Sequence, residues 1–175
     1  MKKFILLFFI SNAAFVILAQ GKANKLVQKG NEYLNSLDFN KADELYNKAL
    51  SIDSNCTEAY IQKSDLEIQK SEFNKALTLI ERARIAAELK NEKNELIAHI
   101  HSVRSFIYFN INNYQKAVDD LNVAISLNDQ NSSYFFMRAL IRRMNSDIKG
   151  CCADLKQASN LGLQKANDSL SMYCK

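Results

Sequence analysis

The side chains that could do chemistry in this sequence are four cysteines and two histidines. The cysteines are Cys56, Cys151, Cys152 and Cys174, and the histidines are His99 and His101. On a helix, two residues apart, the histidine rings point to different faces and cannot share one metal ion as rings four residues apart can. The adjacent cysteines lack the two-residue spacing of thioredoxin-like motifs. Neither set predicts a metal or redox centre.

No further pattern supplies catalytic groups. The sequence contains no glycine-rich phosphate loop, no nucleophile elbow and no Cys/His spacing typical of a metal site. Because no acid, base and nucleophile converge, we expect no catalytic residues, no metal and no cofactor. The protein is therefore expected not to be an enzyme.

The composition predicts an all-α fold. The 175 residues include no Pro and only 4 Gly, and 47% are hydrophobic, which is too little turn chemistry for an all-β sandwich or barrel. The 23 Lys and Arg exceed the 19 Asp and Glu by only four charges. A protein that binds nucleic acid through phosphate contacts usually carries a larger excess, so we expect no nucleic-acid partner.

The first twenty residues resemble a secretory signal peptide. Lys2 and Lys3 precede an apolar stretch, and the small residue Ala19 precedes a polar one. We expect residues 1–20 to be a signal peptide, cleaved after Ala19, and the product to be exported to a periplasm, an envelope or the medium. Ile17 stands where a small residue is preferred, so an uncleaved anchor is the alternative, and only an anchor would bring the chain to a membrane. Abundant Asn and Lys with few Gly and no Pro also suggest an AT-rich bacterial genome.

The rest of the sequence repeats one pattern four times. Two small residues stand seven positions apart with a large apolar residue between them. A third small residue lies twelve positions before the first of these two. The sets are Gly30, Ala42, Tyr46 and Ala49; Ser64, Ala76, Ile80 and Ala83; Ser105, Ala117, Leu121 and Ala124; and Ala139, Cys151, Leu155 and Ala158. Small residues allow helices to approach closely, so each repeat is predicted to be a helix pair. An ordinary helical bundle with accidental spacing is the alternative, but bundles need no such columns.

In these columns the sequence resembles the tetratricopeptide repeat family, whose helix-turn-helix unit has 34 residues. The resemblance implies a right-handed α-solenoid of about four repeats with a C-terminal capping helix in a domain of residues 21–175. The implied repeats are residues 23–56, 57–90, 98–131 and 132–165, and the capping helix is 163–173. The positions that usually hold Trp and Pro in the family hold other residues here.

Seven residues, 91–97, exceed the repeat period between the second and third repeats. No Gly or Pro interrupts residues 83–100, so we expect the two flanking helices each to be longer by one turn.

Four cysteines allow three pairings. If the last repeat helix and the capping helix are antiparallel about Gly162, Cys152 and Cys174 lie at nearly the same height along the hairpin. Cys151 occupies a small-residue column and is expected to be a buried apolar residue. Residues 149–158 also resemble a variant of secreted bacterial tetratricopeptide proteins that carries another Cys near the chain end, which supports a Cys152–Cys174 disulfide. A reactive thiol pair is the alternative.

The family resemblance implies that the first helix of each pair lines a concave groove for a protein or peptide partner. The predicted groove residues are Asn24, Asn31, Asn35, Asp65, Gln69, Phe106, Phe109, Asn110, Phe136 and Arg143. Some of these aromatic residues could instead pack between repeats. Val27 and His99 stand where a grip on a C-terminal carboxylate needs basic residues, which disfavours that mode. We predict a non-catalytic protein-interaction module; a membrane-anchored structural subunit of an envelope assembly and a thiol redox protein are the alternatives.

Overall fold

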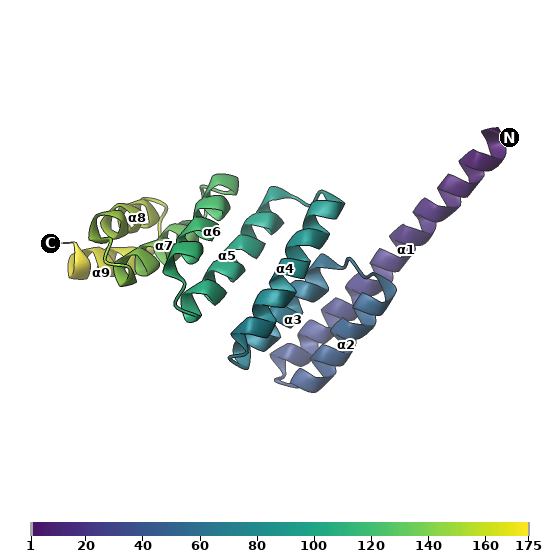
Figure 1. Cartoon of the computed structure of the whole chain (residues 1–175), viewed down its shortest axis with the longest axis horizontal. Coiled ribbons are helices and arrows are strands. Elements are labelled where there is room, and N and C mark those ends of the chain that lie inside the picture. The colour runs from purple at the N-terminus through teal and green to yellow at the C-terminus, as the bar shows by residue number, and fades with distance from the viewer. Residues whose placement is uncertain (1, 175) are drawn as a thin grey trace. The chain divides into compact units, whose positions relative to one another are not determined.

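The computed structural model describes the backbone of residues 2–174 and the side chains of residues 16–174, so Met1 of the expected signal peptide lies outside it. Within this part of the chain the regular elements are all helices (Figure 1). They are α1 (Lys2–Asn35), α2 (Phe39–Ile52), α3 (Thr57–Gln69), α4 (Phe73–Lys90), α5 (Asn94–Asn110), α6 (Tyr114–Leu127), α7 (Ser132–Met144), α8 (Ile148–Asn160) and α9 (Gln164–Tyr173). The predicted all-α class and helical-repeat architecture are confirmed. Among the described side chains, no helix is long and apolar enough to span a membrane.

The helices form two compact units, Met1–Ala86 and Ala87–Lys175. In the first unit α2 packs on α1, and α3 packs on both. In the second unit α5 packs on α6, α6 on α7, α7 on α8 and α8 on α9. We call α1 and α2 the first repeat, α3 and α4 the second, α5 and α6 the third, and α7 and α8 the fourth.

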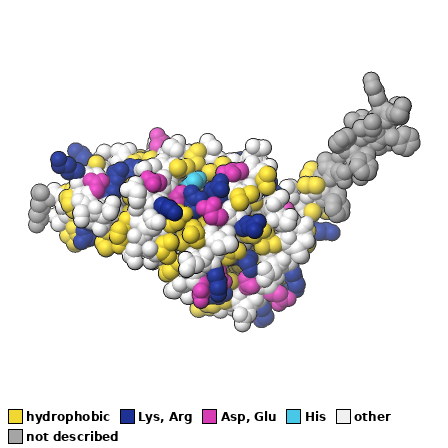
Figure 2. Space-filling model, viewed as in Figure 1, with side chains coloured by type: hydrophobic (Ala, Val, Ile, Leu, Met, Phe, Trp, Pro, Cys, Tyr) yellow, Lys and Arg dark blue, Asp and Glu magenta, His cyan; other side chains and the backbone are white. Residues whose placement is uncertain are grey.

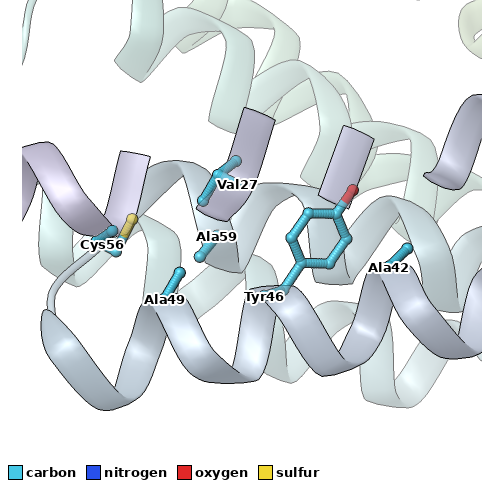
Figure 3. Close-up of a cluster of buried hydrophobic side chains, with 7 residues drawn as sticks. Val27, Ala42, Tyr46, Ala49, Cys56 and Ala59 are labelled. Carbon is cyan, nitrogen blue, oxygen red and sulfur yellow. The ribbon is translucent and has the colours of Figure 1, made fainter. Parts of the chain in front are cut away.

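The small and apolar columns that define the repeat are buried throughout. In the first repeat Tyr46 lies between Ala42 and Ala49 in the core of the unit (Figure 3). A Cβ at Gly30 would overlap the Tyr46 ring, so this position requires glycine. In the second repeat the Ser64 hydroxyl donates to the carbonyl of Ala76 at 3.0 Å. Ser105 and Ala117 make the same contact in the third repeat at 2.7 Å. Close helix approach is thus the physical reason for the spacing.

The turn within each helix pair also recurs. One residue in each turn has a left-handed backbone with φ near +60°: Leu37, Ser71, Asn112 and Ser146. In the first turn the amide of Asp38 donates to the carbonyl of Tyr33 at 2.9 Å, which closes the Schellman motif that ends α1. The Asp38 carboxylate then accepts from the amide of Lys41 and caps α2. Asn113 and Asp147 cap α6 and α8 in the same way.

The seven extra residues lengthen the two helices that flank them. Helix α4 has 18 residues and α5 has 17, whereas the other helices of the second to fourth repeats have 13 or 14. The short turn between α4 and α5 keeps its left-handed residue, here Asn91. The insertion therefore lengthens α4 and α5 and leaves the turn between them short.

Candidate functional site

An apolar pocket opens between α5 and α7 in the second unit. Phe106 and Phe109 line it from α5, and Met137, Leu140 and Ile141 line it from α7. Its volume is about 180 Å³. Residues three and four positions apart share a helix face, which explains why these side chains meet. Two of the predicted groove residues, Phe106 and Phe109, are thus brought together.

The two phenylalanines have different surroundings. Phe109 is half-buried, packs against the core of the third repeat and has its ring centroid 5.8 Å from that of Tyr114. Phe106 is 40% exposed and forms a wall of the pocket that solvent reaches. The Asn110 side chain donates to the carbonyl of Phe106 at 2.8 Å, so this amide is already engaged at the end of α5. Phe106 is therefore the residue of the pair that a partner could cover.

Phe136 and Arg143 lie outside the pocket lining, on the side of α7 that faces the capping helix. Phe136 is half-buried against the core of the fourth repeat. The guanidinium carbon of Arg143 lies 3.9 Å from the ring centroid of Tyr173 in α9. This placement of Phe136 matches the alternative that some groove aromatics pack into the core.

The first unit has a polar hollow between α1 and α3. Asn24, Val27, Gln28 and Asn31 of α1 and Glu58 of α3 surround a volume of about 380 Å³. Two predicted groove residues, Asn24 and Asn31, are thus placed together. The other three predicted in this unit, Asp65, Asn35 and Gln69, do not line it; the last two are exposed at the C-terminal ends of α1 and α3.

Tyr46 connects this hollow to the core of the first unit. Its hydroxyl donates to the Asn31 side chain at 2.8 Å. Burial raises the pKa of Tyr46 to about 12, and the negative charges of Asp65 and Glu58 add to the effect. The hollow is therefore a neutral-to-acidic surface rich in carboxamides, unlike the apolar pocket of the second unit.

The third repeat contains a buried polar cluster that no pattern considered in the sequence predicted. The Asp120 carboxylate is buried and lies 2.8 Å from both Nδ1 of His101 and Nε of Arg104. Burial by itself would raise the pKa of Asp120, but the hydrogen bonds and charges of His101 and Arg104 outweigh it and lower that pKa. His101 thus has a structural partner in the core of the third repeat.

The fourth repeat contains an equivalent cluster. The buried Asp154 carboxylate accepts from Nε of Arg138 at 2.9 Å and from Nη1 of Arg142 at 2.8 Å. Both Asp residues follow their Arg partner, Arg104 or Arg138, by sixteen positions. This spacing, repeated at 34 residues, was the signal in the sequence that could have revealed the clusters.

The cysteines divide into one close pair and two buried residues. The Cα atoms of Cys152 and Cys174 lie 5.7 Å apart, and their sulfur atoms are at bonding distance. Cys56 and Cys151 are both buried. Burial raises the pKa of the Cys151 thiol, which disfavours the reactive thiolate. Among the described side chains, no group of three His, Cys, Asp or Glu could hold a metal ion.

The exposed surface carries charges of both signs. On the face drawn in Figure 2, apolar side chains lie scattered among basic and acidic ones, and neither sign dominates. This distribution offers no continuous basic surface on that face.

Comparison with known proteins identifies the repeat. The family model for the tetratricopeptide repeat matches residues 26–56. A search of curated proteins finds no match. The chain is similar in structure to one chain of the APC/C hetero-tetramer Cut9-Hcn1 (TM-score 0.80, 13% identity), covering 88% of this chain and 30% of that one. It is also similar to MamA (TM-score 0.71, 18% identity), covering 87% of this chain and 80% of that one.

A third similar structure is a tetratricopeptide repeat protein from Parabacteroides merdae (TM-score 0.68, 15% identity), covering 82% of this chain and 55% of that one. The fold and the sites therefore define an all-α helical-repeat protein. Its residues 26–56 match the tetratricopeptide repeat model, in agreement with the resemblance that the sequence columns carry.

Proposed function

We propose that this protein is a non-catalytic protein-interaction module, exported from the cytoplasm, that takes an apolar side chain of a partner segment into the pocket between α5 and α7. The observation that carries the proposal is the exposed Phe106 at the edge of a pocket lined only by apolar side chains. Tetratricopeptide repeats bind protein partners, which makes a polypeptide the expected occupant.

The size of the pocket suits one large side chain. An engineered apolar cavity of about 150 Å³ binds benzene, and this pocket has about 180 Å³. An aromatic or branched aliphatic side chain would fill it and cover Phe106. A buried apolar anchor of this kind is what typically dominates the binding energy of an interface.

The polar hollow of the first unit supports the same function through hydrogen bonds instead of apolar contacts. Asn24, Gln28 and Asn31 present carboxamides that both donate and accept hydrogen bonds, as a peptide backbone does. We propose that this hollow holds the backbone of an extended segment, and that Asn35, Asp65 and Gln69 provide further polar contacts in the first unit.

Selection of peptides tests the apolar site. A random peptide library displayed on phage is panned against the full chain, and the selected peptides are expected to carry an aromatic or branched aliphatic anchor. Phe106→Ala should weaken their binding by about tenfold or more. Ile148→Ala is the matched control, because Ile148 is a comparably exposed apolar residue of the same unit (49%) outside the pocket, and it should change the affinity less than about twofold.

Two results would contradict the proposal. One is that repeated panning selects no peptide, and the other is that selected peptides bind the Phe106→Ala variant as tightly as the parent. Amide hydrogen exchange of the variant, compared with the parent, establishes that its helices are intact.

Export rests on two features that point to the same compartment. The sequence begins with a signal-like segment, and Cys152 and Cys174 are placed for a disulfide, which persists mainly in oxidising compartments. Mass spectrometry of the protein from its native cells tests this. We expect loss of residues 1–19 and two oxidised cysteines; an intact N-terminus with four thiols would contradict export.

One observation favours the membrane-anchored alternative. Helix α1 is continuous from Lys2 to Asn35, and its exposed residues include Val16, Ile17 and Leu18. An uncleaved leader would present this apolar segment ahead of the first repeat. The same mass measurement distinguishes the two candidates, since an anchor retains residues 1–19 while the cysteine pair is oxidised.

A further inference from the structure

Arg143 is an exposed arginine that no carboxylate neutralises. Helix α7 carries three arginines and no acidic residue. The other two, Arg138 and Arg142, both bind the buried Asp154 carboxylate. Arg143, by contrast, is exposed and forms no ion pair with any residue that the structure describes. Its guanidinium is therefore available to a molecule outside the chain.

The ring of Tyr173 covers one face of this guanidinium and leaves its donors free. The guanidinium carbon lies 3.9 Å from the ring centroid, which is the separation of stacked groups in van der Waals contact. A guanidinium donates hydrogen bonds in its own plane, so a ring against its face occupies none of the N–H groups. Tyr173 is itself half-buried against the core of the fourth repeat. The ring thus restricts the motion of Arg143, which lowers the entropic cost of binding an anion.

Arg143 lies beside the apolar pocket but on another side of α7. It is three positions after Leu140, which lines the pocket, so the two side chains are neighbours on the helix surface. The pocket faces α5, whereas the ring that holds the guanidinium belongs to α9. The anion that Arg143 binds is therefore expected on a neighbour of the residue that fills the pocket, and not on that residue itself.

A single available arginine favours a carboxylate over a phosphate. Phosphorylated motifs are typically bound by clusters of arginines, and the other two arginines of α7 already share Asp154. One guanidinium matches one carboxylate, because its planar fork can donate two parallel N–H···O bonds to the two oxygens.

We propose that Arg143 binds an acidic side chain next to the apolar anchor, so that the protein selects partner segments in which Asp or Glu lies within a few residues of an aromatic or branched aliphatic residue. The inference rests on the function proposed above, because the anchor in the pocket brings the acidic side chain to Arg143. An exposed ion pair contributes little affinity. The pocket therefore supplies most of the binding energy, and Arg143 discriminates among segments that carry the same anchor.

A restricted peptide library tests this selectivity. Short peptides with a fixed central Phe or Leu, and with Glu, Gln, Lys or Ala at the flanking positions, are displayed on phage and panned against the full chain. Selected peptides should carry Glu at one preferred position relative to the anchor. A synthetic pair with Glu or Gln at that position, acetylated and amidated so that no terminal carboxylate contributes, is then compared by calorimetry. The Glu peptide should bind about fivefold more tightly at low salt, and the difference should fall below about twofold in about 0.5 M sodium chloride.

Variants assign the preference to one side chain. Arg143→Gln should abolish the difference between the two peptides and leave the affinity of the Gln peptide within about twofold of the parent, which shows that the pocket is intact. Arg143→Lys keeps the charge without the fork and should retain a preference of about twofold. Lys156→Gln is the matched control, because it removes an exposed positive charge from α8 in the same unit and should leave the preference unchanged. Phe106→Ala should weaken both peptides by the same factor, since it affects the anchor alone.

Three results would overturn the inference and leave the proposed function standing, because the peptides still bind in each. The parent could bind the Glu and Gln peptides equally, the preference could persist in Arg143→Gln, or Lys156→Gln could reduce it as much as Arg143→Gln does. If no peptide of the library binds the parent, the proposed function fails and the inference fails with it.

Discussion

The third and fourth repeats each bury an Asp carboxylate at the equivalent position, but the second partner of this carboxylate differs between them. Asp120 and Asp154 each accept from an arginine sixteen residues earlier on the first helix of the pair. The second partner is His101 in the third repeat but Arg142 in the fourth. The repeat thus maintains one contact between its two helices, while the charge around that contact differs between copies. The repeat architecture therefore requires the contact between the Asp carboxylate and the Arg sixteen residues earlier, whereas the second partner of the carboxylate can change.

The largest expected effect is that of Asp154→Asn. It leaves the guanidinium groups of Arg138 and Arg142 without their common anion in a largely buried site. We expect the second unit to lose about 3 kcal/mol of unfolding free energy. Hydrogen exchange of α7 and α8 amides measures this loss of unfolding free energy. A loss below about 1 kcal/mol would show that the two guanidinium groups become hydrated at little cost in free energy.

Asp120→Asn is expected to cost less, about 2 kcal/mol, because only one guanidinium loses its anion. The variant should also change the response to acid. The folded pKa of Asp120 is below its ordinary value of 3.8, so the unfolded chain binds the proton first as the pH falls. The stability contributed by the carboxylate is present above about pH 5 and is lost as the pH falls through the folded pKa.

Urea denaturation at pH 6 and pH 3 measures this response. The parent should lose more stability between the two pH values than Asp120→Asn does. An equal loss in both proteins would exclude Asp120 as a source of the acid sensitivity.

His101→Phe tests whether the two clusters are interchangeable. The position equivalent to His101 in the fourth repeat holds Phe135, whose ring centroid lies 5.6 Å from the guanidinium carbon of Arg138. The variant should let Arg104 lie over a ring in the same way, so we expect a change within about 1 kcal/mol. Thermal denaturation measures it, and a much larger loss would mean that the His101 hydrogen bond is essential.

The smallest effect compares the turns of the same two repeats. Ser146 and Asn112 both have left-handed backbones, with φ of 63° and 60°. Ser146→Gly should stabilise the protein by about 0.5–1 kcal/mol, and Asn112→Gly by less, because Asn already tolerates this conformation. Urea denaturation of both variants gives the order, and destabilisation by Ser146→Gly would contradict this explanation of the turn.

The repeat was predictable because its signal is local and periodic. Ala42, Tyr46 and Ala49 share one face of a single helix, so their spacing alone indicated a buried face. The longer α4 and α5 followed from seven extra residues and the absence of Gly and Pro.

The candidate sites depended on contacts between helices. Phe106 and Phe109 were assigned to the groove by the columns of the family that the sequence resembles, but the position of Phe136 depends on which side of α7 the capping helix covers. The Asp120 cluster was missed because its members come from two helices and have no common local period. Hydrophobic periodicity identifies faces within one helix and does not identify polar partners across two.

The two buried cysteines outside the Cys152–Cys174 pair have a practical consequence. Cys56 belongs to the first unit and Cys151 to the second. Each thiol can react with an alkylating reagent only when the structure around it opens locally. The alkylation rate of Cys56 therefore reports local opening in the first unit, and that of Cys151 reports local opening in the second. Local opening of each unit can thus be measured in the unaltered protein, without attaching a dye or introducing a new cysteine.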